Sequence, residues 1–506
     1  MSCYLTMRRL LPVVACSATL LVTGCAFTGG SAISAGGSGA SSLSQGNMRG
    51  VARGGRQGIY NATVTLYAMS TSTGNYGDTP IQMAQTLTTD SNGDFAFTKG
   101  NDGDLTPVPT ISAGNTSSTW SCPAGASAAA AGSATNPYIY LVAAGGDTSG
   151  AGTSSSNYNN SFSKLMVVLG SCSSLSTGSM FTVNEATTVA SMVALQQFFN
   201  PMTQAIGSKA TNVVGLTNAI SMIGNLVNPG TGVMLQAFTP ATGVPGATVT
   251  VTPEYQKLNT MANILASCVS SNPNSSAGAC NALVANAVPP TFAPPATLGG
   301  QAPGAPVTSP VPPSTCSPSP CADPPSNTNP PYNAVATESA AVTNFPTITT
   351  YPAVADVLQA IDYMLINPTE SQDYLQGTGK LYNLYTAGTS GTPPFSPALT
   401  AQPSDWTVGI GFVPGGGCHN LHSIAITLVT TPPSPPTTPD VTFMNGEYGM
   451  AVDKIGNIWM GGSGGSGSTS YDVLGELSPT GIPINCLSSA SSGTTMNTAG
   501  RRIAID

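Results

Sequence analysis

The N-terminal part of the chain alternates apolar and polar residues with the period of β-strands. Residues 62–67 alternate in this way, and a turn-forming run at residues 90–94 separates them from the next alternating stretch. Apolar runs at residues 138–142 and 165–169 predict two more strands. Short strands joined by such turns predict a small β-sandwich with loops over residues 47–182.

Beyond residue 182 the apolar residues recur at helical spacing. Asn184 is placed to cap the first helix, and Pro201 follows the end of its apolar stripe. Core packing explains such stripes better than a ligand groove does, so we expect a helical domain at residues 183–288 and a helical segment at residues 346–390. The later helices are predicted at residues 212–227, 253–269, 277–287, 354–366 and 370–385.

Prolines without apolar periodicity fill residues 289–345 and predict an extended linker. Strand-like patterns return at residues 406–412 and 423–430, inside a β-rich region that spans residues 391–506. The fold class predicted for the whole chain is therefore multidomain α+β.

Charged residues are scarce. They make up 7% of the 506 residues, and the formal net charge is −8, whereas about 25% is usual for a soluble protein. Phosphate binding needs clustered lysines and arginines, and the sequence has no such cluster. We therefore expect no nucleic-acid partner, and a surface made polar by serine, threonine and asparagine.

The first 25 residues have the pattern of a bacterial export signal. Arg8 and Arg9 precede an apolar run at residues 10–22, which is shorter than the roughly 20 residues of a membrane-spanning helix. The run ends in Val22-Thr23-Gly24-Cys25, which resembles the bacterial lipoprotein signal. An ordinary secretory signal or a short membrane span is the alternative interpretation.

The lipoprotein resemblance implies that residues 1–24 are removed and that Cys25 carries lipid. The membrane is then a partner through this N-terminal anchor, and the location is the cell envelope, at the outer membrane or cell surface. The Gly-, Ser- and Ala-rich residues 25–46 are expected to form a flexible tether.

Eight of the eleven cysteines remain after Cys3 and Cys16 leave with the signal and Cys25 is lipidated. An even number in an oxidising compartment favours disulfides over metal or catalytic thiols. The sequence leaves the connectivity open, although neighbouring elements favour four pairs. These are Cys122 with Cys172, Cys268 with Cys280, Cys316 with Cys321, and Cys418 with Cys486.

The sandwich region resembles a known family. Gly50-Val51 and residues 61–67 and 89–97 are similar to the carboxypeptidase-regulatory-like, prealbumin-type sandwich, although Ile59-Tyr60 stands where that family has Pro and Gly. The resemblance implies structural support or binding without catalysis.

A second resemblance lies near the C-terminus. Residues 449–460 and 473–481 look like one NHL-type β-propeller blade, and residues 502–506 repeat its beginning. Since a propeller closes with about four to eight blades, we expect either a fragment of a longer propeller protein or a gene cut short. The blade motif residues are Asp453, Gly456, Asn457 and Trp459.

Two short segments contain residues that could bind a metal, but a structural role explains each of them better. Residues 90–94 alternate oxygen-bearing side chains but lack the glutamate that ends a calcium loop, so we interpret them as a hairpin turn. His419 and His422 lie beside Cys418 without a second cysteine pair. No metal and no cofactor are expected.

The sequence contains no nucleophile elbow, phosphate-binding loop or zinc-protease motif. Glu185 and Glu254 begin predicted helices, where a carboxylate stabilises the helix dipole. We therefore expect no enzyme, but a binding or scaffold protein that presents a β-propeller to a protein or glycan ligand. The alternative is a propeller enzyme of the lactonase or streptogramin-lyase type whose active-site blades are missing from this chain.

Overall fold

The computed structural model of this chain describes its residues in separate stretches, and every structural statement below refers to them. They are residues 48–71, 81–103, 115–148, 159–175, 178–240, 248–271, 278–289, 352–368, 379–415, 447–453, 455–466 and 469–488.

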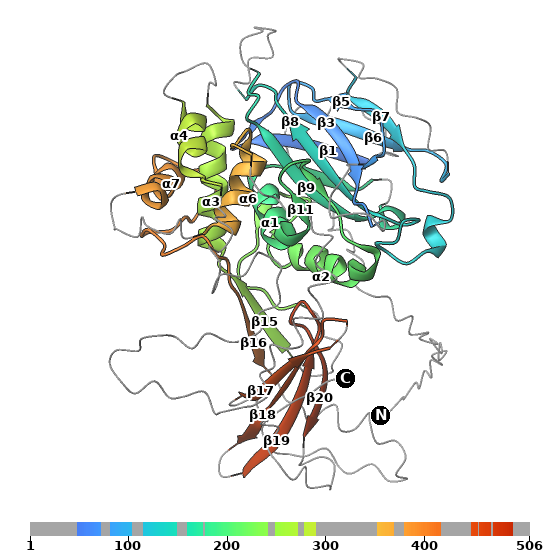
Figure 1. Cartoon of the computed structure of the whole chain (residues 1–506), viewed down its shortest axis with the longest axis vertical. Coiled ribbons are helices and arrows are strands. Elements are labelled where there is room, and N and C mark those ends of the chain that lie inside the picture. Colours follow the sequence, from blue (N-terminus) through green and yellow to red (C-terminus); the bar gives the residue numbers. More distant parts are fainter. Residues whose placement is uncertain are drawn as a thin grey trace, which may run out of the picture. The chain divides into compact units, whose positions relative to one another are not determined.

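Two five-stranded sheets occupy the N-terminal half of the described chain (Figure 1). The first consists of β1 (Met48–Gly54), β2 (Gln57–Gly58), β6 (Asp94–Lys99), β7 (Ser117–Trp120) and β10 (Met180–Val183). Its order is β10-β1-β6-β7, with β2 paired to β1. Strands β1 and β10 run parallel, as do β6 and β7, whereas β1 and β6 run antiparallel.

The second sheet is antiparallel throughout. It consists of β3 (Thr63–Ala68), β4 (Ile81–Gln82), β5 (Leu87–Thr88), β8 (Tyr138–Ala144) and β9 (Lys164–Ser171). Its order is β4-β3-β8-β9, with β5 paired to β3. Nearly every residue of β8 and β9 is buried, so other parts of the chain cover both faces of these strands. Continuous apolar runs in the sequence are typical of strands in such a position.

Asp90 organises the turn between β5 and β6. Its Oδ1 accepts hydrogen bonds from the backbone N–H groups of Asn92 (2.8 Å) and Asp94 (2.9 Å), and Gly93 has a φ of 83°. A tight turn is therefore present, but the prediction of a hairpin is wrong. Strand β5 pairs with β3 and β6 pairs with β1, so the turn carries the chain from one sheet to the other.

The two sheets share a hydrophobic core. Phe95 and Phe97 of β6 meet edge to face, with ring centroids 6.0 Å apart, and both are buried. Leu66 of β3 and Leu141 of β8 belong to the same cluster. Gly50 leaves room for the Phe95 ring, since a Cβ there would lie 2.0 Å from a ring carbon.

The first helix, α1 (Glu185–Leu195), begins where the sequence predicts. Asn184 Oδ1 accepts from the backbone N–H of Thr187 (2.9 Å), and Thr187 Oγ1 accepts from the backbone N–H of Asn184 (3.0 Å). This reciprocal pair satisfies donors that the first helical turn otherwise leaves unpaired. The Asn184 side chain also donates to the carbonyl of Gly232 (2.9 Å), which ties the helix start to a neighbouring loop.

Helix α1 covers the free edge of the second sheet, because β9 is its outermost strand. The backbone N–H of Met166 donates to Thr188 Oγ1 (2.9 Å), and Thr187 Oγ1 donates to the carbonyl of Met166 (3.0 Å). The hydroxyls thus occupy backbone groups that would otherwise be open to another strand. Most of α1 is buried, including its polar residues Thr187, Thr188 and Ser191.

Five more α-helices lie within the described residues. Each overlaps a segment predicted to be helical, although residues 369–378, where the last was expected to begin, lie outside the described residues. They are α2 (Val213–Ile223), α3 (Tyr255–Val269), α4 (Ala279–Asn286), α6 (Val357–Ile366) and α7 (Gly379–Thr389).

Sheets and helices contribute to one continuous core. Val167 of β9, Val189 of α1, Leu265 of α3 and Ile361 of α6 are all buried members of the same hydrophobic cluster. The boundary predicted between residues 182 and 183 falls inside β10 and does not separate two cores. The sandwich region and the helical region therefore pack as one body.

Short hairpins and a second β-region complete the described chain. Two hairpins are made of two-residue strands, β11 (Phe199–Asn200) with β12 (Ala205–Ile206) and β13 (Val227–Asn228) with β14 (Val233–Met234). The longer strand β15 (Thr248–Pro253) pairs antiparallel with β16 (Ile410–Gly415), which lies far away in the sequence. The last sheet is antiparallel and follows chain order, with β17 (Glu447–Val452), β18 (Ile458–Ser466), β19 (Thr469–Leu477) and β20 (Pro483–Ser488). Of the two strands expected near residue 415, the one at residues 406–412 overlaps β16, and residues 423–430 lie outside the described residues.

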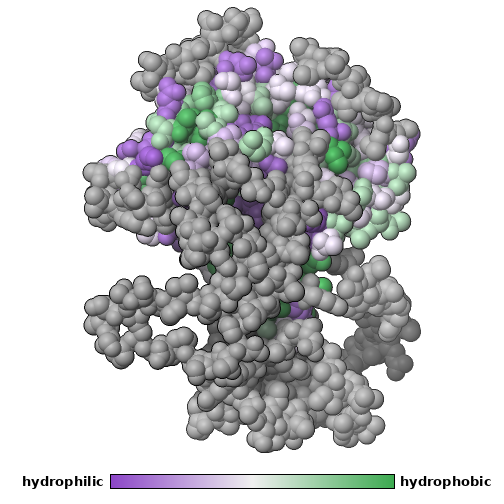
Figure 2. All heavy atoms as spheres, in the orientation of Figure 1, coloured by the Kyte–Doolittle hydropathy of each residue, from purple (hydrophilic) through white to green (hydrophobic). Residues whose placement is uncertain are grey.

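The fold is mixed α+β, as expected from the sequence. None of the helices described is both long and apolar enough to cross a membrane. Hydrophobic and hydrophilic residues are interspersed over the coloured part of the surface in Figure 2. Large apolar side chains that are exposed include Met180, Met202 and Val233.

Replacing Asn184 with Ala should destabilise the protein. The substitution removes the cap of α1 and the bond to Gly232, and we expect the free energy of unfolding to fall by about 1–2 kcal/mol. Urea denaturation followed by circular dichroism measures the change. The exposed Asn101 provides a matched control, since Asn101→Ala should stay within about 0.5 kcal/mol of the parent. Equal stabilities of the Asn184→Ala variant and the parent would contradict the assigned role.

Candidate functional site

The blade motif residues come together in the turn between β17 and β18. Asp453 Oδ1 accepts from the backbone N–H groups of Ile455 (3.0 Å) and Asn457 (2.9 Å), and its Oδ2 accepts from Trp459 Nε1 (3.2 Å). Although desolvation acts in the opposite direction, these hydrogen bonds lower the pKa of Asp453. The carboxylate is fully engaged in holding the turn.

Gly456 and Asn457 complete this turn. Gly456 has a φ of 89°, a conformation that favours glycine. Asn457 Nδ2 donates to Oε1 of Glu476 on β19 (2.9 Å), and both residues are buried. The sequence pattern missed Glu476, which lies opposite Trp459 in the register of β18 and β19. Together these contacts form a structural clamp across three strands.

Two of the four expected cysteine pairs are disulfides in the structure. Cys122–Cys172 links chain positions 50 residues apart, and Cys268–Cys280 closes a shorter loop of 12. All four cysteines are almost completely buried. Asn160 Nδ2 donates to the carbonyl of Cys268 (2.9 Å), so the second disulfide lies against the loop before β9.

Several other expectations fall outside the described residues. They concern the lipidation site Cys25, the cysteines Cys316, Cys321 and Cys418, and the histidines His419 and His422. Cys486 lies on β20, but its expected partner Cys418 is not among the described residues.

Glu185 begins α1 as predicted, but it does not act as the charged, dipole-stabilising carboxylate that the sequence suggested. Its side chain is completely buried, Oε1 accepts from the backbone N–H of Gly55 (2.8 Å), and Oε2 has no hydrogen-bond partner among the described residues. Burial raises the pKa of Glu185 to about 8. At neutral pH this acid is therefore mostly uncharged, and its contribution to the helix dipole is small.

Glu254 lies at the start of a helix, as predicted. It precedes α3, and its Oε2 accepts from the backbone N–H of Gly409 (2.7 Å) and from Lys257 Nζ (3.2 Å). The carboxylate thus connects the start of α3 to the chain just before β16.

Asp362 on α6 is a second buried acid. It is 2% exposed, and burial raises its pKa to about 8. No sequence pattern indicates this burial, because a single aspartate between apolar residues also fits an exposed position on an amphipathic helix.

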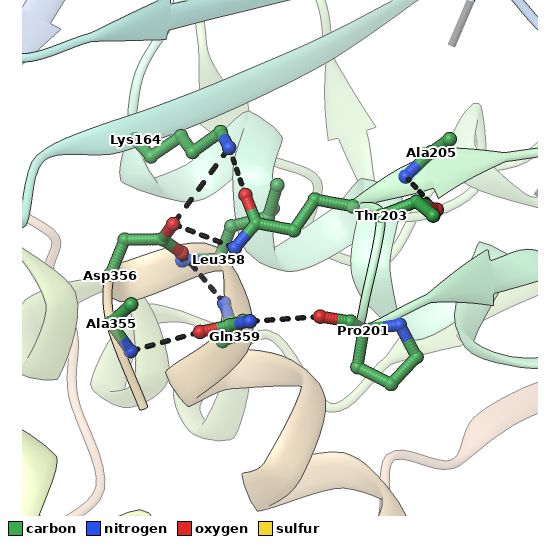
Figure 3. A network of polar contacts seen from close by, with 9 residues as sticks. Lys164, Pro201, Thr203, Ala205, Ala355, Asp356, Leu358 and Gln359 are labelled. Carbon is green, nitrogen blue, oxygen red and sulfur yellow. Dashed lines mark hydrogen bonds and ion pairs between the residues drawn. The ribbon is translucent and has the colours of Figure 1, made fainter. Parts of the chain in front are cut away.

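The side chains of Lys164 and Asp356 point toward each other beside β9 (Figure 3), and Gln204 contacts both. We refer to Lys164, Gln204 and Asp356 as the Lys164 cluster. Lys164 Nζ contacts Oε1 of Gln204, Gln204 Nε2 donates to Asp356 Oδ2 (2.8 Å), and the same Oδ2 lies 3.8 Å from Lys164 Nζ. An amine, a carboxamide and a carboxylate are therefore in mutual contact.

Neighbouring groups fix the carboxylate and the amide of this cluster. Asp356 caps α6, since its Oδ1 accepts from the backbone N–H groups of Leu358 and Gln359, both at 3.0 Å. Gln359 in turn donates from Nε2 to the carbonyl of Pro201 (2.8 Å), which anchors the turn that carries Gln204 (Figure 3). Gln204 itself has a φ of 55°, which is uncommon for a residue other than glycine.

The Lys164 cluster is the candidate functional site, although the sequence interpretation missed it. Its members lie 40 and 152 residues apart, a separation that no local pattern reveals. The available signal was the rarity of charge, because Lys164 introduces a cation at the start of a continuous apolar strand.

No group of three or more His, Cys, Asp or Glu side chains in the described part of the chain is arranged to hold a metal ion. Comparison with known proteins gives no relatives: no family model, no curated protein and no solved structure matches the chain.

Glu185 and Asp362 should make the protein less stable as the pH rises. Their pKa values are 4.5 and 3.8 in an ordinary environment and about 8 here, so the unfolded chain releases both protons first. The free energy of unfolding should then fall between about pH 4 and pH 8. Glu185→Gln should remove part of this decline and stabilise the protein at pH 8 by roughly 1–3 kcal/mol.

Urea denaturation from pH 4 to pH 9 measures this dependence. Glu254→Gln is the matched control, because Glu254 is half exposed and its removal should leave the decline above pH 6 intact. An unchanged slope in Glu185→Gln would mean that the buried acid is already ionised at neutral pH.

Proposed function

We propose that the protein is an exported bacterial envelope lipoprotein, anchored through Cys25, that acts as a non-enzymatic binding or scaffold protein. The observation that carries the proposal is the pair of buried disulfides, Cys122–Cys172 and Cys268–Cys280. Disulfides persist in oxidising compartments such as the bacterial periplasm and the cell surface, and are rare in the cytosol. They agree with the lipoprotein-like sequence that ends at Cys25.

The proposed scaffold has a prealbumin-type sandwich as its support. Two sheets with a common core, built around Phe95 and Phe97, are consistent with such a sandwich. Helix α1 closes the edge of the second sheet, so this part of the protein is protected from pairing with other strands.

The proposed binding element is a β-propeller of the NHL type. A propeller blade is a four-stranded antiparallel sheet, and β17 to β20 pair in chain order as such a blade requires. Asp453, Asn457 and Trp459 hold the turn between β17 and β18 through hydrogen bonds, which supports a structural role for them in a blade. A protein or glycan is the expected ligand, because the scarce charges do not favour polyanions.

Metabolic labelling tests the anchor directly. Cells expressing the chain are grown with an alkyne-tagged fatty acid, and the purified protein is examined for the tag and for its membrane association. We expect the parent to be labelled and Cys25→Ser to lose both the label and the association, since the acylated thiol is absent. Cys16→Ser, within the same signal, is the matched control and should be labelled normally. Labelling that persists in Cys25→Ser, or a parent without any label, would refute the proposal.

A further inference from the structure

The Lys164 cluster brings together the three groups that amide exchange between side chains requires. Lys164 supplies an amine, Gln204 a carboxamide, and Asp356 a carboxylate that touches both (Figure 3). The carboxylate Oδ2 is hydrogen-bonded to the nitrogen that would leave and lies 3.8 Å from the nitrogen that would attack. One acid is thus placed to move protons between the two nitrogens.

We propose that Lys164 and Gln204 become joined by an intramolecular isopeptide bond, with Asp356 transferring the protons. The cluster is then a self-modification site that ties β9 covalently to the turn between β11 and β12. This inference does not depend on where in the cell the protein resides.

The reaction balances without an oxidant or a cofactor. The lone pair of Lys164 Nζ forms a bond to Cδ of Gln204, and the bond from Cδ to Nε2 breaks with its electron pair leaving on nitrogen. The lysine ammonium gives up two of its three protons, and the departing nitrogen gains two. An ammonium ion leaves, and the new amide keeps one proton on Nζ. Both transferred protons pass through the Asp356 carboxylate.

The reaction is accelerated chiefly by the positioning of the amine against the carboxamide. Holding a nucleophile against its target raises its effective concentration to roughly 10⁵–10⁸ M in favourable intramolecular reactions. A single turnover in the life of the protein is sufficient, so the site needs no high rate. Lys164 keeps 29% of its side-chain surface exposed, which leaves the ammonium ion a route to solvent.

The surroundings hold two of the three groups, the carboxylate and the amide, in place. Asp356 Oδ1 is fixed by capping α6, which leaves Oδ2 for the cluster. Gln204 has the uncommon φ of 55° in a turn fastened by the bond from Gln359 to Pro201. Non-glycine residues in such conformations persist where the surrounding structure imposes them, and they gather at functional sites.

Peptide mapping of the full-length protein tests the bond. After reduction and alkylation, trypsin should cut an unmodified chain after Lys99, Lys164 and Lys209, and release peptides 100–164 and 165–209. With the bond present, Lys164 is blocked. We expect a single peptide spanning residues 100–209, with a mass lower by one molecule of ammonia and fragments that locate the link at Lys164 and Gln204.

Two other masses would overturn the proposal. Separate peptides 100–164 and 165–209 at full mass would mean that the cluster is an ordinary ion pair and hydrogen bond. A loss of one water, with the uncut peptide 100–209 linked to the peptide containing Asp356, would mean that the carboxylate is the acyl donor instead.

Variants separate the chemistry from the fold. Lys164→Arg keeps the positive charge but lacks the nucleophilic amine, so cleavage after position 164 should be complete. Asp356→Asn keeps an N-cap for α6 but removes the proton carrier, and the linked fraction should fall at least tenfold at equal age. Lys257→Arg is the matched control, since Lys257 pairs with Glu254 and Asp405, and it should leave the linked peptide unchanged. Linked peptide at the parental level in Asp356→Asn would remove the assigned role of the carboxylate.

Discussion

The structure depends on the burial of α1 against the outer edge of the second sheet. The edge strand β9 has backbone groups that must find partners, and Thr187 and Thr188 provide them at Met166. Because α1 is buried on nearly all sides, α3 and α6 are needed to cover the rest of it. The sheets and the helices therefore bury each other's apolar side chains in one core.

This dependence explains why residues distant in the sequence meet beside β9. Helix α6 follows the Pro-rich residues 289–345, yet Val357 donates its backbone N–H to the carbonyl of Phe162 (3.0 Å), just before β9. The same junction brings Asp356 to Lys164 and Gln204. A covalent link there would fasten the point at which three separate stretches of chain converge.

Local signals in the sequence were sufficient to predict many elements. Asn184 marked the start of α1, and the pairs Cys122–Cys172 and Cys268–Cys280 followed from their neighbouring elements. Asp453, Gly456 and Asn457 marked a turn in which the hydrogen bonds of the Asp453 carboxylate are all local. Each of these depends on residues close in sequence or on covalent chemistry restricted to cysteine.

Features set by tertiary packing could not be predicted in the same way. The turn at Asp90 has the chemistry of a hairpin, but the pairing of β6 with β1 overrides it. Glu185 carries the usual signal of a helix start, and its complete burial, with Oε1 bonded to the backbone of Gly55, depends on the tertiary fold. The three side chains of the Lys164 cluster likewise come together only in the folded chain, because they lie 40 and 152 residues apart. The continuous apolar runs of β8 and β9 are typical of strands buried on both faces, and the sequence interpretation did not use this signal.

Hydrogen exchange through a urea titration tests most directly whether sheets and helices form one cooperative core. Exchange of β8 and β9 is compared with that of α3 and α6 by mass spectrometry, using the full chain with its disulfides intact. A shared core predicts that all four elements lose protection at the same urea concentration. Loss of protection in α3 and α6 at clearly lower urea, with β8 and β9 still protected, would contradict it.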